Sequence, residues 1–163
     1  MTMESRILGP IVLDGGAGGG AMDSTVRFAG TPLPVRLEID HPDRLSESLI
    51  DDLDVVLEHL DIPDRFARDA IRAALRNEHS APAQLFQAWQ QSRGRMDSPV
   101  DEFVDTLRPT KMTITPDGGK ANLDRVVIAY SLSDSSVQGQ ITVRLPDVST
   151  GPEIDPAPRG GFR

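Results

Sequence analysis

The chain has 163 residues, of which 38% are hydrophobic, and it carries a net charge of −8 and no cysteine. This length suits one domain with a core of its own. The lack of cysteine excludes disulfides, thiolate metal sites and cysteine nucleophiles, and it favours a cytoplasmic location. Because an acidic surface repels phosphates and anionic lipid, we expect neither nucleic acid nor a membrane as partner. The sequence contains no run of about 18 apolar residues, so no membrane span is predicted.

Three strands are predicted in the N-terminal part of the chain, at residues 6–13, 24–29 and 34–39. In the second and third, apolar residues alternate with polar ones, as in a strand that buries one face. Pro10 lies in the first, and proline cannot donate to a strand ladder, which predicts an edge position or a bulge. The short connections between the three predict an antiparallel block.

Four helices are predicted next, because the apolar residues change to spacings of three and four. Pro63 is expected in the first turn of the second helix. Ser80 with Pro82, and Ser98 with Pro99, are typical of the cap and first turn of the third and fourth helices. The predicted apolar faces are Leu45, Leu49, Leu53, Val56, Leu57 and Leu60 in the first helix, and Phe66, Ala70, Ile71, Ala74 and Leu75 in the second.

The C-terminal part predicts three further strands, at residues 110–115, 123–132 and 140–145. Residues 1–145 are therefore predicted to form a single α+β domain. Its sheet is expected to be antiparallel, with about six strands in two three-stranded blocks, and the helices inserted between the blocks should pack on one face. Residues 146–163 are rich in proline and glycine and predict a disordered tail.

A glycine-rich connection, residues 15–20, follows the first predicted strand. Residues 16–21, GAGGGA, match the G-x-G-x-x-A pattern of a dinucleotide-binding loop. Such a loop must lead into a helix, because the helix N-terminus holds the pyrophosphate. The residues that follow alternate as a strand instead, so we interpret the glycines as a flexible connection.

Asp40, His41 and Asp43 form a candidate metal site at the end of a predicted strand. One imidazole and two carboxylates are able to bind a divalent metal ion. The same residues also suit a polar turn in which Asp43 caps the next helix. The sequence favours the turn, and we predict no cofactor.

Charged residues recur on one side of each of the first two predicted helices. The acidic stripe consists of Glu47, Asp51, Asp54 and Glu58, and the basic stripe consists of Arg65, Arg68, Arg72 and Arg76. Both stripes are predicted to lie opposite the apolar faces. Asp64 and Asp69 each lie four residues from an arginine and partly neutralise the basic stripe. The acidic stripe is either a recognition surface for a basic partner or a solvated helix face.

The order ILGPIVLD, STVRFAG, VRLEID, then DRFARDAIRAAL, then VVIAYSL and ITVRLPD resembles an uncharacterised bacterial family of small α+β domains of unknown function. In strand and helix order such domains are similar to immunity-type proteins encoded beside polymorphic toxins. The resemblance covers residues 6–145. It implies an inhibitor of a partner protein and transfers no catalytic residue.

Three hypotheses on function follow. The first is a non-enzymatic, soluble protein-binding module, immunity-like, whose acidic stripe meets a basic partner protein. The second is an enzyme with a site of carboxylates or a metal site centred on His41. The third is a domain without catalysis that serves as part of an assembly.

Overall fold

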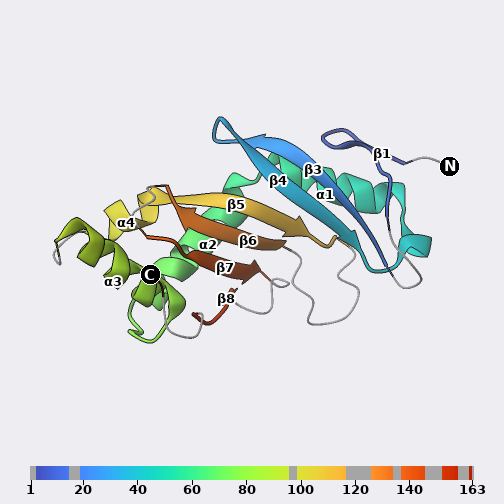
Figure 1. The fold of residues 1–163 in the computed structure, drawn as a ribbon. Coiled ribbons are helices and arrows are strands. Elements are labelled where there is room, and N and C mark those ends of the chain that lie inside the picture. The colour runs from blue at the N-terminus through green and yellow to red at the C-terminus, as the bar shows by residue number, and fades with distance from the viewer. Residues whose placement is uncertain are drawn as a thin grey trace.

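The computed structural model describes residues 3–14, 19–95, 99–116, 126–133, 137–145, 152–157 and 162. A six-stranded sheet carries helices on one face, and a small two-stranded sheet lies beside the first helix (Figure 1). The strands are β1 (Glu4–Ser5), β2 (Gly9–Pro10), β3 (Gly20–Phe28), β4 (Thr31–Ile39), β5 (Leu107–Ile114), β6 (Val126–Leu132), β7 (Gln140–Leu145) and β8 (Glu153–Ile154). The helices are η1 (Pro42–Arg44), α1 (Glu47–Glu58), α2 (Asp61–Ala74), α3 (Ala81–Arg93) and α4 (Val100–Thr106).

The large sheet is mixed, in the order β3-β4-β5-β6-β7-β8. The α+β class is confirmed, but the prediction of a purely antiparallel sheet is wrong. β4 and β5 are parallel, with Val35 opposite Met112 and Leu37 opposite Ile114. Parallel neighbours need a long crossover connection, and the helical segment between β4 and β5 supplies one.

The first predicted strand, residues 6–13, is wrong in extent. β1 and β2 are two residues each, and a turn at Arg6–Leu8 joins them. The hydroxyl of Ser5 accepts hydrogen bonds from the backbone N–H groups of Ile7 and Leu8, at 3.1 and 2.9 Å, and holds this turn. The hairpin belongs to its own small sheet, and the sixth strand of the large sheet is β8.

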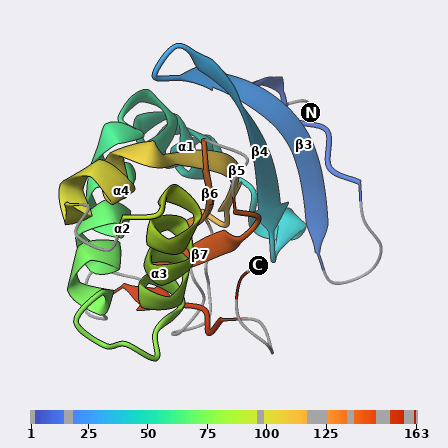
Figure 2. The same ribbon diagram turned by 60° about the vertical axis from the view of Figure 1, so that its left-hand side comes forward.

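The helices lie on one side of the large sheet (Figure 2), and the core of buried apolar side chains is made of residues from both layers. Alternate residues of β4 and β6 are buried, as the period of two predicts. Leu53 of α1 and Ile71 of α2 are fully buried beneath them. Phe66, expected on the buried face of α2, is 58% exposed. That part of the prediction is wrong, because α2 turns Ala67 and Ile71 toward the core.

Serine side chains cap the N-termini of two of the helices. Ser46 accepts a hydrogen bond from the backbone N–H of Leu49 and caps α1, so the expectation that Asp43 is the cap is wrong. Ser80 accepts from the backbone N–H of Ala83 and caps α3, as predicted. Because serine at the N-cap satisfies a backbone donor that the helix leaves unpaired, both caps stabilise the helix starts.

The described part of the C-terminal segment packs on the domain, unlike the expected disordered tail. β8 pairs with β7, and the guanidinium of Arg144 donates to both carboxylate oxygens of Asp155, at 2.7 and 3.1 Å. The ring of Phe162 lies against Gly139, where a Cβ atom would clash with it and with Leu85. Residues 146–151, 158–161 and 163 lie outside the described part, and the prediction of disorder stays untested there.

Deletion of residues 152–163 should therefore destabilise the domain. Loss of the β8 pairing, the Asp155 ion pair and the Phe162 packing should cost about 1–2 kcal/mol, which lowers Tm by roughly 2–8 °C in a chain of this size. Differential scanning calorimetry measures the shift, and Phe162→Ala should reproduce part of it. A Tm unchanged within about a degree would show that this segment contributes nothing to stability.

Candidate functional site

The structure divides the predicted acidic stripe. Glu47, Asp51 and Glu58 are exposed, whereas Asp54 is only 1% exposed, so its predicted solvent position is wrong. The stripe lies at the border of the buried face of α1 rather than opposite it. Asp54 is on the side of this border that the N-terminal hairpin covers.

Asp54 is held by residues of the β1–β2 hairpin. The hydroxyl of Ser5 donates to Oδ1, and the backbone N–H of Arg6 donates to Oδ2 at 3.0 Å. The Arg6 guanidinium lies 3.6 Å from Asp54 and 3.3 Å from Glu58. A buried carboxylate is stable only when it is paired and hydrogen-bonded, and these contacts meet that need. Sequence reasoning missed them because no local pattern connects Ser5 to α1.

The exposed side of α1 and of the α1–α2 turn combines acidic and apolar residues. We call it the α1–α2 surface, and it consists of Glu47, Asp51, Asp52, Val55, Glu58, Asp61, Ile62 and Phe66. Val55 is 53% exposed, and the acids three and four residues away on α1 are its neighbours. Ile62 is 49% exposed and lies one helical turn from Phe66. Among the described residues, only Glu58 of these five acids has an ion pair.

Asp40, His41 and Asp43 are not brought together as a set of metal ligands. Asp43 lies in η1 and is exposed. In the described ranges, no three His, Cys, Asp or Glu side chains are placed to hold a metal ion. Of the glycine-rich connection, residues 15–18 lie outside the described part. Gly20 begins β3, so a strand follows the glycines, as predicted.

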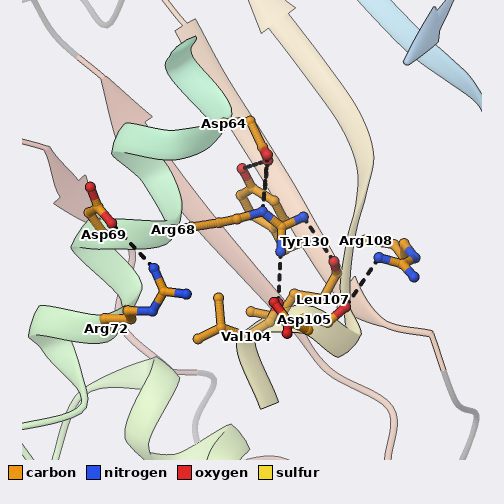
Figure 3. Close-up of polar contacts among 9 residues, drawn as sticks. All are labelled: Asp64, Arg68, Asp69, Arg72, Val104, Asp105, Leu107, Arg108 and Tyr130. Atoms are coloured by element: carbon orange, nitrogen blue, oxygen red, sulfur yellow. Dashed lines mark hydrogen bonds and ion pairs between the residues drawn. The ribbon is translucent and has the colours of Figure 1, made fainter. Parts of the chain in front are cut away.

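A polar network joins α2 to the sheet (Figure 3). The predicted Asp64–Arg68 pair is confirmed, with Nε of Arg68 3.0 Å from Oδ2. Arg68 also donates to the carbonyl oxygens of Val104 at 2.7 Å and Leu107 at 3.0 Å. The hydroxyl of Tyr130 in β6 donates to Asp64 at 2.7 Å. Arg68 is only 18% exposed in its side chain, so it is not part of a solvated basic stripe.

Tyr130 has a strongly perturbed acidity. Burial raises the pKa of its phenol well above the ordinary value, and the negative charge of Asp64 and the hydrogen bond to it raise it further, against the opposing charge of Arg68. The phenol therefore remains a hydrogen-bond donor throughout the neutral range. In chemical terms the network is a fixed donor–acceptor chain that ties α2, β6 and the α4–β5 junction together.

A cleft of about 590 Å³ borders this network. One wall is the β3–β4 turn, with apolar side chains at Phe28, Pro32 and Leu33. Asp64 and Arg68 of α2 also line the cleft, and so do Asp105, Arg108 and Pro109 at the α4–β5 junction, which we call the rim. The sequence does not indicate this cleft, because its three segments come together only in the folded sheet.

Comparisons with protein-family models, with curated proteins and with solved structures found no match for this chain. None of the helices that the structure describes is long and apolar enough to cross a membrane. The site therefore has to be interpreted from its own geometry.

Asp54→Ala should destabilise the protein far more than Asp51→Ala. The first variant leaves the Ser5 hydroxyl and the Arg6 N–H without their buried acceptor, which should cost about 2–4 kcal/mol. The second removes a solvated charge, and we expect a cost under about 0.5 kcal/mol. Urea unfolding of both variants measures the difference. Equal costs for the two variants would contradict a stabilising role for the hydrogen bonds of Asp54 with Ser5 and Arg6.

The network also predicts a loss of stability in alkali. The pKa of the Tyr130 phenol is higher in the folded than in the unfolded protein, where it is about 10. The stability that this difference contributes is fully present below about pH 10 and is lost progressively as the pH rises above that value. Urea unfolding of the wild type should therefore show falling stability above about pH 10, and Tyr130→Phe should lack this component. Tyr130 is the only tyrosine, so phenolate absorbance reports on it alone. Phenolate formation at about pH 10 in a protein still folded by circular dichroism would contradict the assignment.

Proposed function

We propose that the protein is a non-enzymatic protein-binding module whose α1–α2 surface binds a basic partner protein. The observation that carries this proposal is the exposed Val55 on a helix face where Asp51 and Asp52 have no ion pair within the described residues. Asp51 and Asp52 precede it by four and three residues, and Glu58 follows it by three.

The energetics support binding over simple solvation. Like charges at helical spacings of three and four destabilise a free helix by a few tenths of a kcal/mol per pair. A cationic partner would relieve this repulsion and be steered toward the surface. Interfaces bury an apolar centre inside a polar rim, and Val55, Ile62 and Phe66 offer apolar area beside the acids.

The resemblance to immunity-type proteins suggests the kind of partner. An inhibitor of a basic toxin needs an acidic surface that forms before the encounter and does not depend on the toxin for its shape. Here α1 is fixed by its buried leucines and by the Asp54 contacts, so the acids at its exposed side are held in place.

Charge reversal on α1 tests the proposal. The basic partner is first isolated by a pull-down with the wild-type chain. We expect Asp51→Lys/Asp52→Lys to slow association with this partner by about ten-fold or more at low salt, and less at high salt, where charges are screened. The matched control is Glu78→Lys/Glu153→Lys, which changes the net charge equally at exposed acids outside the surface. Stopped-flow or surface plasmon resonance measures the rates.

Two results would contradict the proposal. One is an equal loss of association rate in both double variants, since that would reflect net charge alone. The other is a pull-down with the immobilised wild-type chain that retains no basic protein. A Val55→Ala variant separates the apolar contribution, because loss of a buried apolar contact should increase the dissociation rate rather than reduce the association rate.

A further inference from the structure

We propose that the cleft between the β3–β4 turn and the α4–β5 junction binds a small zwitterion with an apolar body, of the class of short peptides with two free termini. This site is independent of the α1–α2 surface. Asp64 and Arg68, which line the cleft, lie on the buried side of α2 with Ala67 and Ile71, whereas Ile62 and Phe66 are exposed to solvent.

The size and walls of the cleft suit such a ligand. Its volume of about 590 Å³ lies within the range of small-molecule sites, which are mostly apolar with a few polar groups. Phe28, Pro32 and Leu33 beside the β3–β4 turn, with Pro109 at the α4–β5 junction, supply an apolar lining for side chains.

The charges of α2 in the cleft are already satisfied. Asp64 accepts hydrogen bonds from Arg68 and Tyr130, and Arg68 donates to Asp64 and to the carbonyl oxygens of Val104 and Leu107. Because this ion pair has no net charge, it does not favour a ligand that is purely anionic or purely cationic.

The charges at the rim are not satisfied in the same way. Asp105 and Arg108 are both exposed, and neither has an ion pair within the described residues. Nη1 of Arg108 donates to the backbone carbonyl of Asp105 at 3.1 Å, and its other N–H groups have no acceptor in the part of the chain described. One anionic and one cationic side chain thus border the same cleft, and a ligand with an ammonium and a carboxylate would complement both.

The network beneath makes this rim rigid. Arg68 donates to the carbonyl oxygens of Val104, which precedes Asp105, and of Leu107, which precedes Arg108 (Figure 3). The backbone that carries both rim charges is therefore fixed before a ligand arrives. Such preorganisation reduces the entropic cost of binding.

The test is a binding titration, by NMR chemical shifts, with three probes: the dipeptide leucyl-leucine, its N-acetyl form and its C-terminal amide. We expect the free dipeptide to bind at least about ten-fold more tightly than either capped form, a difference of about 1.4 kcal/mol. Arg108→Gln should abolish the discrimination against the amide, and Asp105→Asn the discrimination against the acetylated form. Arg65→Gln and Asp69→Asn are the matched controls, since both residues are exposed on α2 outside the cleft lining.

Three outcomes would overturn the proposal. They are the absence of saturable shifts with leucyl-leucine up to millimolar concentration, equal binding of free and capped dipeptides, and shifts that map away from the cleft. Circular dichroism of the two rim variants checks that they fold, and both are expected to do so because their side chains are exposed.

Discussion

The side chain of Arg68 holds the helical layer to the sheet. It lies on α2, where it pairs with Asp64, and it reaches the α4–β5 junction through two backbone carbonyls. Its guanidinium lies 5.3 Å from the ring centroid of Tyr130 in β6. A partly buried guanidinium with this many acceptors is strongly constrained in position. The orientation of α2, and with it both the cleft and the exposed side of the α1–α2 surface, depends on these contacts.

The N-terminal hairpin sets the composition of the α1–α2 surface. By covering Asp54 it takes one acid out of the predicted stripe, and by pairing Arg6 with Glu58 it neutralises a second one in part. Asp52, which the stripe did not include, lies on the exposed side instead. The charge that a partner would meet is therefore decided by a contact between segments far apart in the sequence.

Local patterns in the sequence predicted most of the elements. The alternation in residues 34–39 and 140–145 identified β4 and β7, and Ser80 correctly marked the start of α3. Long-range facts were beyond this reasoning. The parallel β4–β5 pairing, the Asp54 contacts and the cleft all join distant segments, and Phe66 shows that helical spacing alone leaves the buried face of a small-residue helix such as α2 ambiguous. For the candidate sites, the residue types were visible in the sequence but their exposure was not.

The parallel pairing of β4 with β5 has a consequence for how the chain folds. The β3–β4 and β5–β6 pairings each join two strands that follow one another directly in the chain. The pairing of Val35 with Met112 instead closes a loop that contains all the helices of the described ranges. Closing such a loop is entropically costly, and non-local pairings slow folding. The central seam of the sheet should thus be the last to form, once the helices have drawn its two halves together, and slow folding would leave strand edges open to other chains during synthesis.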